Sequence, residues 1–164
     1  QGEKGQDSRM IEQLRIIEDD LTGEAISALL RFHLDELHRL SPPESCHAMP
    51  IERLRAPDVK FWSAWEGKSL AGCGALKQLD SSHGEIKSMR AAPDYLGKGV
   101  GKPILLHLLA EAKARGYARL SLETGSAGEF LPAQRLYASH GFTPCPPFAD
   151  YRVDPLSLYM TRVL

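Results

Sequence analysis

The 164-residue sequence predicts one α/β domain in which strands and helices follow one another along the chain. Apolar residues that repeat every three to four positions over 24–40 and 103–115 indicate amphipathic helices. Short runs of alternating or continuous apolar residues before and after them indicate strands. A glycine-rich stretch lies between one of these strands and the second helix, which is where we expect a ligand to bind.

Apolar periodicity and turn residues predict the element order β-α-α-β-β-β-α-β-α-β-β. The elements are a strand at 10–17, helices at 24–40 and 50–55, strands at 59–65, 70–79 and 85–91, a helix at 103–115, a strand at 120–124, a helix at 132–140, and strands at 142–145 and 156–163. Residues 1–9 are polar and contain two glycines, so we expect a disordered tail before a domain at 10–164.

Turn-forming residues separate the elements in the N-terminal half. Asp19 to Gly23 interrupts the first strand, and the pair Pro42-Pro43 ends the long helix because proline cannot continue it. Glu66-Gly67-Lys68 indicates a tight turn between two strands. Gly72 and Gly74 leave one face of the second of these strands without bulk, so a neighbouring backbone or a ligand is expected to come close there.

The stretch Leu96 to Lys102 organises the C-terminal half. Its three glycines sit at alternate positions ahead of a helix, and the N–H groups of such a loop, with the free donors of the helix, suit a phosphate. Pro103 is expected at the first helical position. No Gly-Lys-Ser or Gly-Lys-Thr is present and the spacing is not the dinucleotide one, which excludes those two nucleotide motifs. Four cations are expected around the loop: Lys87, Arg90, Lys98 and Lys102.

Two blocks of sequence resemble the GNAT acyltransferase superfamily. The segment 85–101 (EIKSMRAAPDYLGKGVG) is similar to its acetyl-CoA-binding motif, and 133–142 (AQRLYASHGF) is similar to its helix with a Leu-Tyr pair and a closing Gly-Phe. The resemblance covers almost the whole chain after Met10. It implies the GNAT fold, a mixed central sheet with a splayed parallel strand pair and helices on both faces. The sequence departs from the family at Leu96, where Arg or Gln is usual.

The resemblance implies an N-acetyltransferase that moves an acetyl group from acetyl-CoA to a primary amine of a small molecule by direct attack. The backbone of Met89, Arg90 and Ala91 would pair with the pantetheine arm as an added strand does. The pyrophosphate would bind the N–H groups of six consecutive residues: Gly97, Lys98, Gly99, Val100, Gly101 and Lys102. A non-catalytic acyl-CoA-binding or sensing module is the alternative, and transfer of a longer acyl group is a third possibility.

The family likeness also implies catalytic residues. Tyr137 would donate to the leaving sulfur, although a tyrosine that only packs in the core has the same helical spacing. An alkyl amine titrates near ~10, so a base or water must take its proton at neutral pH. Glu85 and Glu123 are the candidate bases, each acting through water, and each could equally be a solvated carboxylate. Cys145 is disfavoured as a nucleophile because no partner base is evident.

The acceptor pocket is expected between the loop after the first long helix and the segment 146–152. His47 lies in the first of these segments, and Phe148 and Tyr151 in the second would form apolar walls. Neither segment identifies the acceptor beyond a small molecule with an amine.

Composition excludes several other classes of function. Twenty Lys and Arg residues against 21 Asp and Glu residues give a net charge of −1, so nothing favours nucleic acid or membrane as a partner. Three cysteines without a CxxC spacing argue against a disulfide framework and a zinc site, and no metal is expected. No run of about eighteen apolar residues and no leader peptide is evident, which predicts a cytoplasmic protein. A homodimer is left open.

Overall fold

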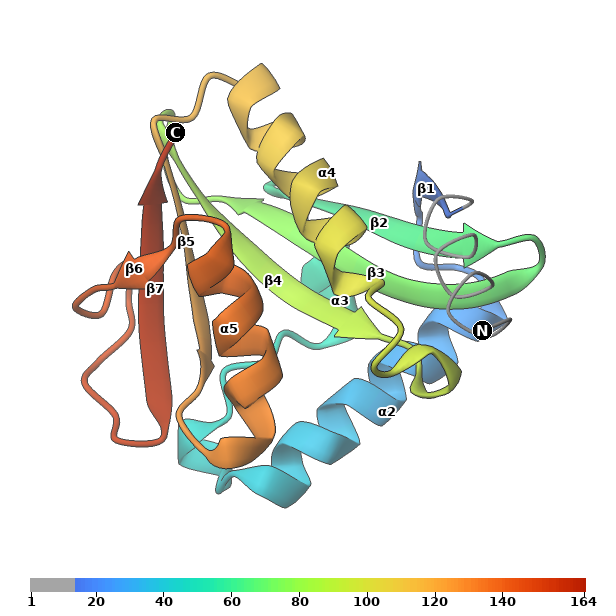
Figure 1. Cartoon of the computed structure of the whole chain (residues 1–164), viewed down its shortest axis with the longest axis horizontal. Coiled ribbons are helices and arrows are strands. Elements are labelled where there is room, and N and C mark those ends of the chain that lie inside the picture. The colour runs from blue at the N-terminus through green and yellow to red at the C-terminus, as the bar shows by residue number, and fades with distance from the viewer. Residues whose placement is uncertain (1–13) are drawn as a thin grey trace, which may run out of the picture.

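A computed structural model describes residues 14–164 (Figure 1). The predicted tail and residues 10–13 of the predicted first strand lie outside the described residues. The strands are β1 (Arg15–Glu18), β2 (Val59–Glu66), β3 (Ser69–Gln78), β4 (His83–Ala91), β5 (Arg119–Gly125), β6 (Thr143–Pro144) and β7 (Ser157–Val163). The α-helices are α2 (Glu24–Leu40), α3 (Ile51–Leu54), α4 (Gly101–Ala114) and α5 (Leu131–Ser139), with single 3₁₀ turns at Pro43–Ser45, Pro93–Tyr95 and Gly128–Phe130. The predicted element order is confirmed.

The strands form one sheet with the spatial order β1-β2-β3-β4-β5-β7-β6. Every neighbouring pair is antiparallel except β4 and β5, which are parallel. The connection between these two strands contains α4, as a parallel crossover requires. The predicted mixed sheet with a central parallel pair is therefore confirmed.

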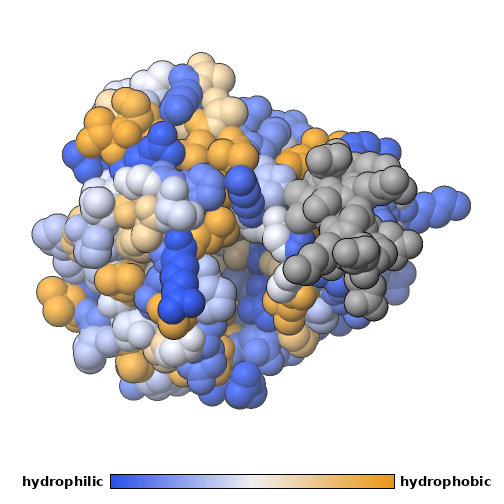
Figure 2. All heavy atoms as spheres, in the orientation of Figure 1, coloured by the Kyte–Doolittle hydropathy of each residue, from blue (hydrophilic) through white to orange (hydrophobic). Residues whose placement is uncertain are grey.

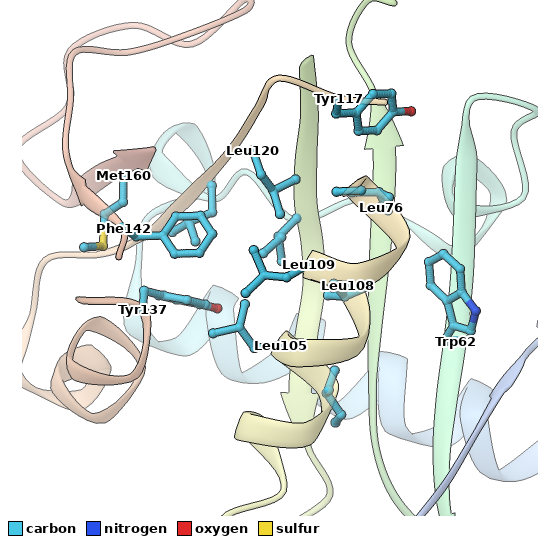
Figure 3. Packing of buried hydrophobic residues seen from close by; sticks show 14 of the residues in the cluster. Trp62, Leu76, Leu105, Leu108, Leu109, Tyr117, Leu120, Tyr137, Phe142 and Met160 are labelled. Carbon is cyan, nitrogen blue, oxygen red and sulfur yellow. The ribbon is translucent and has the colours of Figure 1, made fainter. Parts of the chain in front are cut away.

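Helices cover both faces of the sheet, and each face has its own apolar cluster. Phe61 and Trp62 are neighbours in β2, so their side chains point to opposite faces and belong to different clusters. The cluster that contains Trp62 is formed with α4 and α5, and Figure 3 shows Leu105, Leu108 and Leu109 of α4 at its centre. The cluster that contains Phe61 is formed with α2 and α3. We call these two faces the α4 face and the α2 face.

The two glycines of β3 allow α4 to lie close to the sheet. A Cβ atom on Gly72 would stand 2.9 Å from Ile104 Cδ1, and one on Gly74 would stand 3.0 Å from Ile104 Cγ2. Both distances are shorter than ordinary van der Waals contacts, so larger residues would push the helix outward. The close approach predicted at these glycines is confirmed: the neighbour is α4 at both positions and, at Gly72, also the backbone of β4 at the Arg90 carbonyl oxygen.

The helix after the glycine loop begins two residues earlier than predicted. Val100 already has α-helical dihedral angles as the N-cap, so Gly101 and Lys102 are helical and Pro103 is the third helical residue. Proline is accommodated there because the first N–H groups of a helix have no intrahelical acceptor. Within residues 14–164 no helix combines the length and the apolar character needed to cross a membrane.

Candidate active site

A cleft opens where β4 and β5 separate. The two strands pair only from His83 to Ile86 on β4 and from Arg119 to Leu122 on β5, although both continue for several residues beyond. A cleft of about 520 Å³ lies there, bounded by α2, the loop after α2, both strands and α5. The space-filling view shows a hollow between α5 and the N-terminal end of α4, with apolar and hydrophilic residues around it (Figure 2). The predicted splay of the parallel pair is confirmed.

An irregularity in β4 coincides with this separation. Cys73 of β3 pairs with Arg90 and Ala75 pairs with Lys87, so Ser88 and Met89 together oppose the single residue Gly74. Ser88 has a φ of 52°, which is costly for a residue other than glycine. The Cys73 thiol donates to the Ser88 carbonyl oxygen at 3.2 Å. Such a bulge bends its strand, and here it accompanies the departure of β4 from β5.

The register assigns the β4 side chains to faces. Directly opposed residues of antiparallel strands share a face, and Ala75 and Cys73 belong to the α2 cluster. Lys87 and Arg90 therefore lie on the α2 face, whereas Met89 packs against the α4 cluster. The expectation that Lys87 and Arg90 surround the glycine loop is wrong for their side chains, because strand alternation directs them to the face opposite α4.

A buried polar network forms the α2 side of the cleft. Glu85, only 2% exposed, accepts a 2.6 Å hydrogen bond from the Tyr151 hydroxyl at Oε2. Lys87 Nζ donates to the Tyr151 hydroxyl at 2.8 Å and to the His47 carbonyl at 3.2 Å, and lies 3.4 Å from Glu85 Oε2. Burial, followed by the Glu85 charge, raises the pKa of Tyr151 far above the usual range, so the phenol stays protonated and remains a donor. Glu85 is thus already engaged by one hydrogen-bond donor and one ion-pair partner.

Glu123 lies one residue beyond the last β5 residue that pairs with β4. It is opposite Tyr159 of β7, on the α2 face, and it lines the cleft. Within residues 14–164 no cation lies within ion-pairing distance of its carboxylate. Burial is the main cause that raises its pKa, and the neighbouring Ser157 side chain, followed by the His47 and Lys87 charges, opposes that shift. Glu123 is therefore the less engaged of the two predicted bases.

Tyr137 faces the cleft from the other side of the sheet. It projects from α5, is buried, and directs its hydroxyl toward α4 near Leu105 (Figure 3). The hydroxyl forms no hydrogen bond with another residue of the described chain. Burial, together with the Glu123 charge, raises the pKa of Tyr137, so the phenol is neutral across the working pH range. Its edge-to-face contact with Phe142, at 5.9 Å between ring centroids, fixes its position.

The glycine loop presents a row of free backbone donors. Gly97 and Gly99 have φ angles of 73° and 78°, a region that favours glycine. Five N–H groups in the loop and the first helical turn donate to no described residue, those of Gly97, Gly99, Val100, Gly101 and Lys102. A Cβ on Gly101 would stand 2.9 Å from Leu136 Cδ2, so this glycine lets α5 pack against the start of α4. The loop has the donors that an anionic group requires.

Leu96 and Lys98 are the two large side chains at the start of the loop. Leu96 is 58% exposed, and it occupies the position at which the GNAT sequences that this chain resembles usually have Arg or Gln. Lys98 Nζ lies over the Tyr95 ring at 5.8 Å from its centroid. Free N–H groups, rather than side chains, are thus the main feature of the loop.

The predicted acceptor residues lie at different depths. His47 lines the cleft, and its ring meets the Tyr151 ring edge-on at 5.2 Å. Phe148 does not line the cleft but packs behind Tyr151, at 5.1 Å between ring centroids, and also contacts Tyr159 and His83. Tyr151 likewise supports the cleft from behind through Glu85. Phe148, Tyr151 and Tyr159 thus form a cluster of aromatic rings in mutual contact behind the cleft.

The role of Lys87 in the buried network was missed by the sequence analysis. Glu85 and Lys87 are two residues apart in a strand, and that spacing places them on one face, a signal that could have revealed the pair. Among residues 14–164 no group of three or more His, Cys, Asp or Glu side chains is arranged to hold a metal ion.

Comparison with known proteins identifies the family. The model of the Acetyltransferase (GNAT) family matches residues 26–142, more than half of the chain. The chain belongs to the GNAT acetyltransferase family. It is 58% identical over 146 residues to the Uncharacterized N-acetyltransferase YsnE of Bacillus subtilis (strain 168), covering 89% of this chain and 97% of the relative. It is 53% identical to the Uncharacterized N-acetyltransferase YedL of Escherichia coli (strain K12), covering 89% and 92%.

A solved structure agrees with this assignment. The acetyltransferase superposes on the putative acyl-CoA N-acyltransferase of Klebsiella pneumoniae subsp. pneumoniae MGH 78578 with a TM-score of 0.74 and 27% identity, covering 92% of this chain and 97% of that one. The protein is therefore an N-acetyltransferase, and members of its family use acetyl-CoA.

The residues of this acetyltransferase fit acetyl-CoA. The five free N–H groups at the start of α4 suit a pyrophosphate, and the edge of β4 that faces β5 has no strand partner beyond Ile86 and can hydrogen-bond to amide groups. Met89, Leu136 and Ala133 supply an apolar lining on the α4 face of the cleft.

Proposed function

We propose that this acetyltransferase transfers the acetyl group of acetyl-CoA directly to a primary amine of a small molecule. One observation carries the proposal: Glu123 and Tyr137 face the same cleft from opposite faces of the sheet, at the point where β4 and β5 separate. A base on one side and a hydrogen-bond donor on the other are what amide formation from a thioester requires.

The binding part of the proposal assigns acetyl-CoA to the α4 side of the cleft. The backbone of Met89, Arg90 and Ala91 would hold the pantetheine arm, and the N–H groups of residues 97–102 would hold the pyrophosphate, with Lys98 and Lys102 adding positive charge. Bound acetyl-CoA supplies an acetyl thioester. Every further group that the reaction needs comes from the acceptor, the protein or water.

Glu123 is the proposed base. Its carboxylate has no cation partner within residues 14–164, and its pKa is raised, which brings it closer to that of an amine. Glu85 is the weaker candidate because Tyr151 and Lys87 already donate to or pair with its carboxylate. We infer that Glu85 instead fixes Tyr151, and through Lys87 the His47 loop, beside the acceptor.

Tyr137 is the proposed donor to the leaving sulfur. A thiol has a reference pKa of about 8.5 and a phenol about 10, and burial raises the pKa of Tyr137 further. Complete proton transfer from this phenol to a thiolate is therefore uphill, so its main contribution is a hydrogen bond to the negative charge that develops on sulfur. Water can complete the protonation once the product leaves.

Kinetics and binding measured on the same variants test this assignment. Tyr137→Phe and Glu123→Gln should each lower kcat by about 10²- to 10⁴-fold, the usual range for acid–base groups, and leave the Kd of CoA within a few-fold of wild type. Phe148→Leu serves as a control, because Phe148 lies behind the cleft. If wild type binds CoA but acetylates no amine, the chain acts as an acyl-CoA-binding or sensing module. A preference for propionyl- or succinyl-CoA would assign it a longer acyl group.

The same proposal covers the setting of the reaction. We expect a cytoplasmic enzyme whose partner is the small-molecule acceptor, without nucleic acid, membrane or metal. Size-exclusion chromatography with light scattering distinguishes a monomer from the homodimer that the sequence leaves open.

A further inference from the structure

The α2 side of the cleft contains a cation, Arg90, that forms no ion pair within residues 14–164. Arg90 lines the cleft with its guanidinium 5.1 Å from the centroid of the Phe32 ring on α2. Its Nε atom is buried and has no hydrogen-bond partner, and within residues 14–164 no carboxylate lies within 4.0 Å of the guanidinium. Buried donors in native proteins are almost always satisfied, so this one calls for a partner that residues 14–164 do not supply.

The nearest acidic group on α2 is already occupied. Glu36 accepts hydrogen bonds from Arg39, at 3.4 Å from Nε and 3.1 Å from Nη2. Glu85 is likewise paired with Lys87 at 3.4 Å. The charged residues of the cleft thus include two ion pairs, while Arg90, Glu123 and the exposed Glu129 have no ion-pair partner within residues 14–164.

A second polar atom beside Arg90 is also unsatisfied. His33 lines the same cleft, and its Nδ1 atom is buried without a partner in the described part of the chain. Burial, followed by the Arg90 charge, lowers the pKa of this imidazole to about 4 and so keeps it neutral at physiological pH. A neutral imidazole can still donate one hydrogen bond, so His33 and Arg90 together can bind one oxyanion.

We propose that the acceptor is an amino carboxylic acid, whose carboxylate binds Arg90 and His33 while its amine faces Glu123. This inference rests on the acetyl transfer proposed above. Arg90 and Glu123 give the cleft a free positive and a free negative group, and an amino acid has the complementary pair of charges. The anion belongs to the acceptor rather than to a CoA phosphate, because Arg90 points to the α2 face and the free N–H groups of the glycine loop lie at the start of α4.

The test compares matched acceptors. A panel of amino acids, each with its primary amide, is assayed by release of the CoA thiol, and the ratio of kcat/KM for acid over amide is taken for each pair. Charge-assisted hydrogen bonds of this kind predict a ratio on the order of 10 to 100 for at least one pair with wild type. Arg90→Gln should reduce the ratio to about one, and Arg90→Lys should give an intermediate ratio because it keeps the charge but loses the planar fork.

Two further measurements keep the outcomes distinct. Arg39→Gln is the matched control, since Arg39 also lines the cleft but is paired with Glu36, and the acid preference should persist in it. The Kd of CoA is measured for each variant. If Arg90→Gln weakens CoA binding and lowers acid and amide turnover alike, Arg90 binds a CoA phosphate and the inference is overturned.

Binding without turnover separates this inference from the proposed function. Thermal shifts of the CoA-loaded protein with each acid and amide report binding even if no amine is acetylated. A shift specific to the acids that disappears in Arg90→Gln supports the oxyanion site although acetyl transfer fails. Equal shifts, or none, for acids and amides in wild type overturn it, whether or not amines are acetylated.

Discussion

Replacing Lys87 by methionine tests the buried network behind the cleft. The side chains of Lys87 and Glu85 are only 9% and 3% exposed, and their charged atoms lie 3.4 Å apart. Methionine keeps the length of the lysine stem and removes the charge, leaving Glu85 buried with Tyr151 as its remaining donor. Removing one partner of a buried ion pair costs about 3–5 kcal/mol. At about 2–4 °C per kcal/mol for a domain of this size, Tm should fall by roughly 6–20 °C.

The assay is thermal and urea unfolding of four proteins at neutral pH: wild type, Lys87→Met, Glu85→Gln and the double variant. The double variant should be more stable than the sum of the single losses predicts, because it leaves no uncompensated buried charge. Lys60→Met is the surface control, since Lys60 and Glu18 form a 3.4 Å pair with side chains 47% and 61% exposed. That control should change stability by under about 1 kcal/mol. A loss of under about 1 kcal/mol for Lys87→Met would refute the claim that breaking the buried Lys87–Glu85 pair is costly.

Three further predictions concern other residues. Because burial raises the pKa of Glu123, its ionised form opposes folding once the pH exceeds the pKa of this residue in the unfolded chain. Urea unfolding near pH 7 should therefore show Glu123→Gln to be at least as stable as wild type. The same variant should lose the lowest ascending limb of the pH profile of kcat/KM, and retention of that limb would exclude Glu123 as the base. The pKa of His33 falls from 6.5 to about 4 on folding, so the unfolded chain binds a proton at this residue more readily than the folded one. The free energy of unfolding should therefore be unaffected by His33 above pH 6.5 and should decrease toward pH 4 by up to about 3 kcal/mol. Unfolding midpoints of His33→Asn should lack this decrease. Gly99→Ala and Gly67→Ala each place alanine at positive φ (78° and 57°) and should cost about 1 kcal/mol, but calorimetry should show weaker CoA binding for Gly99→Ala alone.

Local sequence patterns were sufficient to predict the elements. The helix at Glu24–Leu40 has the predicted bounds, because its apolar stripe is continuous and a prolyl pair follows it. Strand bounds are within two residues for β2, β3 and β4. The start of α4 was missed because Pro103 was taken as a first helical residue, whereas proline is tolerated throughout the first turn.

The parts of the site that depend on tertiary contacts were less predictable. Nothing in the residue type of Ser88 indicates a bulge with positive φ, since serine is not a residue that favours this conformation. Lys87 was expected with three other cations around the glycine loop, and only its contacts with Tyr151 and the His47 carbonyl place it in a buried network. These partners are 64 and 40 residues away in the sequence.

The stoichiometry of one turnover tests the central claim most directly. The acetyltransferase is mixed with acetyl-CoA and an amino acid acceptor, and free thiol, N-acetyl product and intact protein mass are measured on the same samples. Direct attack at the cleft predicts one N-acetyl product per thiol released, no thiol release without an amine, and an unchanged protein mass. Thiol release without an amine, or a transient protein mass increase of one acetyl group, would contradict direct transfer between Glu123 and Tyr137.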